Sequence, residues 1–224
     1  MIRFKGISAL NSLPSWQEVN KRKREKEMNV KDWKWLNESQ IINENGEIVI
    51  YAPEKTDWFN NPIPEADGST SKPVANAPFY YTDVEGDFVF SVKVRPNHKF
   101  VYDACAIMCI EDEYVWMKAA FEKSDFGTTA AVCVATNQIS DDANGCNITQ
   151  EYVWLKVCRV GDVFSALYSL DGETYNMVRL FKLPVKKSIK VGIEAQSPAG
   201  EGGLRYFSDL KLELKTVNNL RAGE

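Results

Sequence analysis

The chain has 224 residues, a formal net charge of −4 and an isoelectric point near 5.3, which suits one large domain or two small ones. This slightly acidic balance argues against a nucleic-acid-binding protein, because such domains are usually basic. The sequence contains no run of about eighteen apolar residues and no secretory leader pattern, so we expect neither a membrane span nor export, and a cytoplasmic location.

The first 27 residues differ in character from those that follow. The stretch "KRKREKE" (Lys21 to Glu27) is a dense charge run with helical propensity and no apolar stripe. It fits a solvated extension, a basic tail for an acidic partner, or a leader preceding a natural start at Met28. We therefore expect a charged N-terminal extension over 1–27 that adds little to the fold, a β-sandwich over 28–216 and a C-terminal tail over 217–224.

Strand-like alternation of apolar and polar residues dominates the chain after Met28. In "GDFVFSVKVRP" the apolar residues fall on every second position, and "EIVIYAP" alternates in the same way. Further strands are expected at 103–110, 114–122, 129–136, 151–160, 163–170, 175–181, 187–195 and 205–214. Asp171-Gly172 and Gly161-Asp162 predict hairpin turns, and no capped helix is expected after residue 40. The pattern predicts an all-β fold, an antiparallel sandwich or barrel.

The segment 57–77 and the cysteines carry two further expectations. The segment is rich in Pro, Asn, Gly and Ser, which predicts a long loop of the kind that often has a function. The five cysteines form no C-x-x-C pair, and His98 is the chain's single histidine. We therefore expect no metal site and no cofactor, and we expect the cysteines to be buried free thiols: Cys105, Cys109, Cys133, Cys146 and Cys158.

One face of the predicted strand 114–122 is unusual. It carries Trp116, Lys118, Ala120 and Glu122, whereas the other face is apolar. The preceding strand is expected to place Tyr102, Ala104, Ala106 and Met108 beside this face, and the following strand Thr129, Ala131, Cys133 and Ala135, with Val132 and Val134 in the core. Small floor residues beside a few polar and aromatic groups suit a shallow ligand trough. The alternative is that the segment 57–77 packs onto the alanines and fills the trough.

Several motifs, in a fixed order, resemble one known family: "TDWF", "APFYYTDVEGDF", "YDACAIMCIEDEYVWMKAAFE", "YSLDGETY" and "SPAGEGG". The chain resembles the "regulation of enolase" family of concanavalin A-like domains from about Trp33 to Leu214. The resemblance implies an antiparallel two-sheet jelly roll of the lectin and glucanase type, with one concave face. Two glycines of the family pattern are replaced here by Ala106 and Ala120, which narrows the trough.

The Lys118 face of the strand 114–122 also bears on whether the protein is an enzyme. Concanavalin A-like glucanases need two carboxylates that flank the scissile bond. The strand 114–122 offers Glu122, but Lys118 stands four residues before it, so we predict no catalytic residue. The favoured hypothesis is a non-catalytic binding module for a small polar or carbohydrate-like ligand, without nucleic-acid or membrane binding. Its predicted site consists of Lys118, Glu122, Trp58, Tyr102, Trp116 and Gln196. The alternatives are a protein-interaction domain that contacts a metabolic enzyme such as enolase, and a carbohydrate-active or other small-molecule enzyme.

Overall fold

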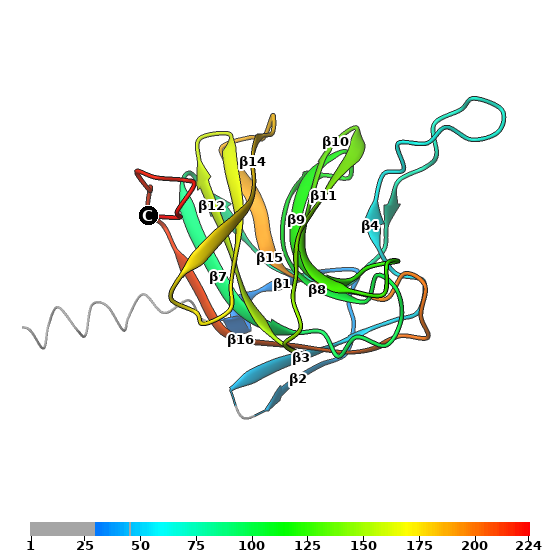
Figure 1. The fold of residues 1–224 in the computed structure, drawn as a ribbon. Helices are drawn as coiled ribbons and strands as arrows, with labels where there is room; N and C mark the ends of the chain where they lie inside the picture. Colours follow the sequence, from blue (N-terminus) through cyan, green and yellow to red (C-terminus); the bar gives the residue numbers. More distant parts are fainter. Residues whose placement is uncertain (1–29, 45) are drawn as a thin grey trace, which may run out of the picture.

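The fold is a sandwich of two large antiparallel sheets, seen in a computed structural model that describes residues 30–44 and 46–224 (Figure 1). In spatial order, the first sheet contains β1 (Lys34–Leu36), β6 (Phe79–Glu85), β15 (Ser188–Gln196), β8 (Ala104–Asp112), β9 (Val115–Lys123), β10 (Thr129–Asn137) and β11 (Ile139–Asn147). The predicted extension over 1–27 lies outside the described residues. The predicted all-β jelly-roll class is confirmed.

The second sheet also has seven strands. In spatial order these are β14 (Tyr175–Lys182), β13 (Val163–Ser169), β12 (Val153–Val160), β7 (Phe88–Arg95), β16 (Gly203–Glu213), β3 (Glu47–Ala52) and β2 (Ile41–Glu44). A 3₁₀ turn, η1 (Val30–Asp32), precedes β1. The described residues contain no helix long and apolar enough to cross a membrane.

The main core lies between the two sheets. Sheet two contributes every second residue of β7, as the alternation predicts, and sheet one contributes the apolar face of β8 and β9. These residues are almost completely buried: Phe88, Phe90, Val92, Val94, Cys105, Ile107, Met117 and Phe121. The opposite face of β8 and β9, which carries Lys118, therefore points away from the second sheet, toward the concave side seen in Figure 1.

The face predicted for β10 is wrong. Lys118 pairs with Val134, and Ala120 pairs with Val132, so these valines share the Lys118 face. Ala131 and Cys133 lie in the core between the sheets instead. Both faces of β10 are small and apolar, so alternation carries no signal there, and a shift of one residue exchanges the two faces.

The segment 57–77 is more ordered than the predicted loop. It contains β4 (Trp58–Phe59) and β5 (Val74–Ala75), which pair with each other. Figure 1 shows this hairpin on the concave side of the first sheet, with its tip extending away from the body. We call residues 56–77 the flap. The tip is exposed, whereas Trp58 and Ala77 at its base are buried.

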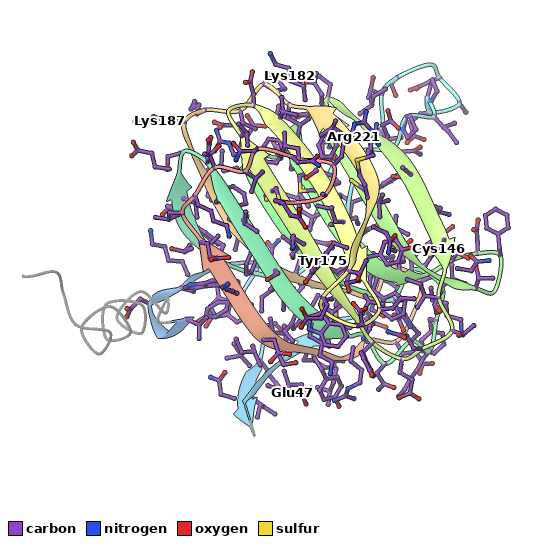
Figure 2. The ribbon with its side chains drawn as sticks, turned by 60° about the vertical axis from the view of Figure 1, so that its left-hand side comes forward. Glu47, Cys146, Tyr175, Lys182, Lys187 and Arg221 are labelled. Carbon is purple, nitrogen blue, oxygen red and sulfur yellow. The ribbon has the colours of Figure 1, made fainter. Side chains whose placement is uncertain are left out.

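The C-terminal segment lies against the outer face of the second sheet, where Figure 2 shows it near the labelled Arg221. Val217 and Leu220 pack against a small apolar cluster formed by Val89, Cys158 and Leu167. The last residues therefore cover a patch of the second sheet that is remote from the flap.

The cysteine prediction is confirmed for four residues and wrong for one. Cys105, Cys109, Cys133 and Cys158 are free and buried, but Cys146 is exposed, with its Sγ 2.8 Å from the hydroxyl oxygen of Tyr168. Cys146 lies on β11, an edge strand whose polar sequence gave no strand signal. Within the described part of the chain, no group of three or more His, Cys, Asp or Glu side chains could hold a metal ion.

Candidate functional site

Three alanines form the floor of the site on the concave face of the first sheet. Ala104, Ala106 and Ala120 pack together, and each is fully buried. Glu194 of β15 pairs with Ala106, which in turn pairs with Ala120, so the three lie in one row across the sheet. Gln196, Ala104 and Glu122 form the adjacent row. The methyl groups leave room above the sheet for longer polar side chains from neighbouring positions.

Lys118 ties the sheet to the flap. Its side chain is 3% exposed, and its Nζ donates to Asp57 Oδ1 at 2.8 Å, to the Trp58 carbonyl at 2.9 Å and to Gln196 Oε1 at 2.7 Å. An ammonium group has three hydrogens, so all its donor capacity is used. Lys118 thus holds the base of the flap against the floor.

Gln196 connects Lys118 to Glu122. Its amide oxygen accepts from Lys118, and its Nε2 donates to Glu122 Oε2 at 3.2 Å and to the Tyr102 carbonyl at 2.9 Å. The side chain is buried, and both amide hydrogens are used. Together with the Trp58 carbonyl that Lys118 bonds, the network joins five of the six predicted site residues.

Glu194 is the site residue that the sequence reasoning missed. It is fully buried on the same face as Gln196, two residues along β15. Neither carboxyl oxygen has a hydrogen-bond partner among the described residues. A buried polar group without a partner is uncommon in native proteins. Strict alternation outward from Gln196 could have identified it.

The site holds more acid than base. Burial raises the pKa of Glu194 to about 8; Lys118 opposes this shift, while Asp57 and Glu122 add to it. Glu122 is half-buried, and burial likewise raises its pKa to about 8. Burial lowers the pKa of Lys118, but the nearby carboxylates, first that of Asp57, outweigh this and raise it overall. One ammonium thus serves several carboxyl groups, and near neutral pH Glu122 and Glu194 favour their protonated forms.

Tyr102 marks the open end of the site. Its ring is 39% exposed, and its hydroxyl lies 3.4 Å from Asp125 Oδ2 in the β9–β10 turn. Its backbone adopts φ 64°, in the left-handed region that non-glycine residues rarely enter. The main chain is held there by bonds from its own N–H to Lys123 and from Gln196 to its carbonyl.

The two predicted tryptophans lie on the closed side of the site. Trp58 and Trp116 are buried, in an edge-to-face arrangement with ring centroids 6.2 Å apart. Their indole N–H groups donate to the carbonyls of Ala77 and Glu113. They pack in an apolar cluster with Phe79, Met108 and the β10 valines, so the flap covers this part of the trough. The covering segment considered from the sequence is therefore present on this side of the face.

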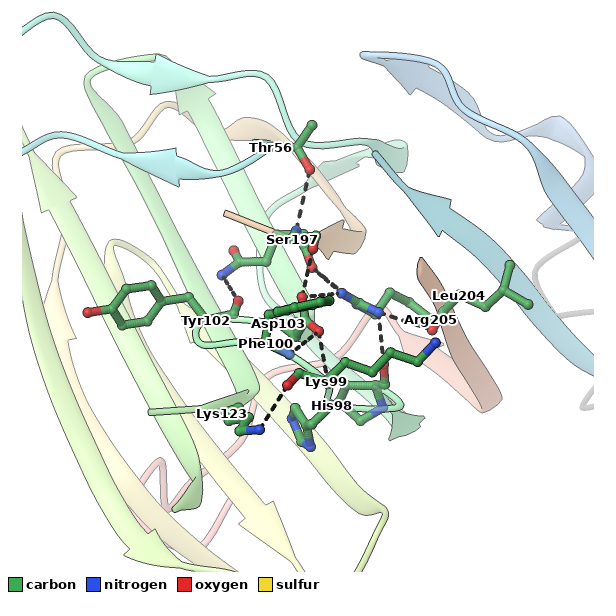
Figure 3. Close-up of polar contacts among 12 residues, drawn as sticks. Thr56, His98, Lys99, Phe100, Tyr102, Asp103, Lys123, Ser197, Leu204 and Arg205 are labelled. Atoms are coloured by element: carbon green, nitrogen blue, oxygen red, sulfur yellow. Dashed lines mark hydrogen bonds and ion pairs between the residues drawn. The ribbon is translucent and has the colours of Figure 1, made fainter. Parts of the chain in front are cut away.

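A buried ion pair supports the open end from behind (Figure 3). Arg205 Nη2 lies 2.7 Å from Asp103 Oδ1, and both side chains are 1% exposed. Arg205 also donates to the backbone carbonyl of Gln196 through Nε and Nη2, at 3.1 and 2.9 Å. Asp103 follows Tyr102 and accepts from the Ser197 hydroxyl at 2.7 Å. The pair therefore fixes the backbone on both sides of the Tyr102–Gln196 contact.

Replacing Lys118 with alanine should lower the free energy of unfolding by about 2 kcal/mol, because Asp57 and Gln196 would lose a buried charged donor. Urea denaturation measures this change. Lys190→Ala is the matched control, since Lys190 lies on the same face but is only half-buried. Equal losses for the two variants would show that Lys118 does not anchor the flap.

The fold and the concave polar cluster define the class: a concanavalin A-like β-sandwich. Residues 35–215 match the model of the family described as "Protein of unknown function (DUF1349)", and the chain belongs to this family. It is 30% identical over 183 residues to "Regulation of enolase protein 1" of Saccharomyces cerevisiae, covering 80% of this chain and 87% of that protein. The resemblance noted from the sequence motifs is therefore confirmed.

Two solved structures illustrate the range of similarity. A functionally unknown protein from Saccharomyces cerevisiae superposes with a TM-score of 0.73 at 28% identity, covering 83% of this chain and 98% of that chain. The carbohydrate-binding module CBM66 from Bacillus subtilis superposes with a TM-score of 0.51 at 11% identity, covering 80% and 94%. At that identity the second likeness concerns the fold alone.

Proposed function

We propose that this protein is a non-catalytic binding module for a small, polyhydroxylated, carbohydrate-like ligand, bound on the concave sheet at the open end of the alanine floor. The observation that carries the proposal is the buried, unpartnered carboxyl group of Glu194 beside a polar network that reaches solvent at Glu122 and Tyr102. A ligand hydroxyl can bond to Glu122, which reaches solvent, and an exposed tyrosine ring offers a face for a sugar ring.

Two considerations favour binding over hydrolysis. A glycoside hydrolase needs two carboxyl groups that reach opposite sides of one bond. Glu194 is fully buried, so of the two carboxyl groups whose pKa is raised to about 8 only Glu122 meets the solvent. The residue four positions before Glu122 on the same strand face is Lys118, whose donors are used by Asp57, Trp58 and Gln196, so no second carboxylate stands there.

The test is a binding screen with Tyr102→Ala. We expect a neutral oligosaccharide panel, followed by nuclear magnetic resonance or calorimetry, to identify a ligand. Its affinity should fall roughly tenfold in the variant, because a stacked aromatic ring contributes on the order of 1 kcal/mol. Tyr114→Ala is the control, since Tyr114 is 40% exposed at the β8–β9 turn, at the other end of these strands. Equal affinity in both variants would place the ligand elsewhere.

The name of the yeast relative supports a second candidate, a regulatory contact with enolase. Purified enolase mixed with this protein should then form a complex in analytical ultracentrifugation. A stable complex, together with a sugar panel in which nothing binds, would favour this second function over the first.

A further inference from the structure

We infer that the ligand of the concave site carries a protonated amine. This inference rests on the proposed function and adds the chemical class that the site selects. It follows from the hydrogen-bond capacity left in the site, from the balance of its charges and from the buried carboxyl group of Glu194.

The side-chain donors at the floor are already used. Lys118 spends its three hydrogens on Asp57, Trp58 and Gln196, and Gln196 spends its two on Glu122 and Tyr102. A ligand group that can only accept, such as a carboxylate or a phosphate, would thus find no free N–H at the floor.

The acceptors, in contrast, remain available. Glu122 accepts one hydrogen bond, from Gln196, among the residues that the structure describes, and a carboxylate can accept several. Both oxygens of Glu194 are unpartnered in the same part of the chain. Once the proton of Glu122 is displaced, its carboxylate is an acceptor only, and an alkylammonium group offers three hydrogens from one atom.

The balance of charges around the floor also favours an ammonium group on the ligand. Lys118 already forms an ion pair with Asp57, which leaves Glu122 and Glu194 without a cation of their own at the floor. On β11, the exposed Asp142 pairs with Val134, which pairs with Lys118, so it adds a further carboxyl group to the same row. Burial raises the pKa of both Glu122 and Glu194 and Lys118 offsets this only in part, so they hold their protons near neutral pH. A ligand ammonium beside Glu122 would displace its proton and pair with the resulting carboxylate, whereas an anion would gain no such partner.

Glu122 is the direct contact in this arrangement, since it is the half-exposed member of the acidic pair. Glu194 is fully buried, so it does not touch the ligand, and its two oxygens, unpartnered among the described residues, mark the lack of donors behind the floor. Tyr102 would bound the entrance, with its exposed ring next to Asp125.

The experiment compares three tetrasaccharides that differ in charge. β-1,4-linked glucosamine, glucose and galacturonate tetramers are titrated into the protein at pH 6 by calorimetry, with putrescine as an amine that is not a sugar. The glucosamine tetramer should bind at least roughly tenfold more tightly than the glucose tetramer, and the galacturonate tetramer should bind most weakly. The preference should shrink as salt is added.

Glu122→Gln tests the contact. The preference for the glucosamine tetramer over the glucose tetramer should fall to within about threefold, because the amide keeps the shape but cannot ionise to pair with the bound cation. Glu173→Gln is the matched control: Glu173 is exposed in the β13–β14 turn of the other sheet, and the change in net charge is identical. If Glu122→Gln melts early, Asp142→Asn, at an exposed position, should reduce the preference in the same direction.

The outcomes separate this inference from the proposed function. Glucose or galacturonate tetramers that bind as tightly as the glucosamine tetramer would overturn the inference that the ligand carries an amine and leave the proposal of carbohydrate binding intact. If putrescine binds and none of the tetrasaccharides does, the result would support an amine ligand and overturn the proposal that the ligand is a carbohydrate. If none of the four compounds binds, both the proposed function and this inference fail.

Discussion

Replacing Arg205 with methionine should lower the free energy of unfolding by about 3–5 kcal/mol, because it leaves the Asp103 carboxylate buried without its partner charge. Asp103 would keep the backbone N–H groups of Lys99 and Phe100, each 3.0 Å from Oδ2, and the hydroxyl of Ser197. Those donors do not replace a cation. Urea denaturation at pH 7 measures the loss.

Arg95→Met is the matched control for this buried pair. Arg95 forms an ion pair with Glu47 at 3.2 Å, with both side chains roughly one third exposed, so its loss should cost about 1 kcal/mol or less. If both variants lose the same free energy, the Arg205–Asp103 pair does not stabilise the fold more than a surface pair does.

The same substitution should also affect the site. Arg205 binds the carbonyl of Gln196, and Asp103 follows Tyr102 directly in the chain. Loosening these backbones would release the Gln196 amide from Glu122 and Tyr102. Any ligand of the open end should therefore bind Arg205→Met more weakly under conditions in which that variant remains folded.

The polar face of β9 could be predicted from the sequence because the residues on the two faces of this strand differ clearly in polarity. Lys118 and Glu122 alternate with Met117 and Phe121, and only one of these pairs suits a core. On β10 the same reasoning failed, since Ala131 and Val132 are equally suited to either face. Register there is set by the pairing with Lys118 and Ala120, which no local pattern records.

The sequence reasoning missed two site residues, for different reasons. Glu194 was within reach, since it shares the face of Gln196 at a spacing of two. Asp57 was not, because it meets Lys118 across 61 positions through a flap that the composition marked only as a loop. Where a loop packs depends on tertiary contacts, and the Trp58–Trp116 packing that directs the flap becomes visible only in the folded chain.

The second large effect concerns Glu194 and pH. Because burial raises its pKa to about 8 in the folded state, above the ordinary value of 4.5, the folded protein holds a proton that the unfolded chain gives up. The stability from this group is complete below pH 4.5 and is lost as the pH rises through 8. Glu194→Gln removes this loss, so at pH 8.5 the variant should be more stable than the wild type by roughly 4–5 kcal/mol, at about 1.4 kcal/mol per pKa unit.

Urea denaturation of the two proteins at pH 5, 6.5 and 8.5 measures the difference. Charged groups from three other elements act on Glu194: Lys118 and Glu122 on β9, Asp57 on the flap and Arg205 on β16. None of these changes in the variant, so the difference between the two proteins isolates Glu194. At pH 5 the two stabilities should agree within about 1 kcal/mol.

His98 makes the comparison with the variant necessary. Burial lowers the pKa of His98 to about 4, so the folded state resists its protonation and loses stability as the pH falls from 6.5 through 4. The free energy of unfolding of the wild type therefore falls at both low and high pH, because His98 resists protonation and Glu194 resists ionisation in the folded state. Glu194→Gln should remove the Glu194 share of the loss at high pH, keep the share of Glu122, whose pKa burial also raises to about 8, and leave the loss at low pH unchanged. A variant that still loses as much stability as the wild type between pH 5 and 8.5 would show that Glu194 is ionised in the folded protein, and that its buried oxygens have donors at neutral pH.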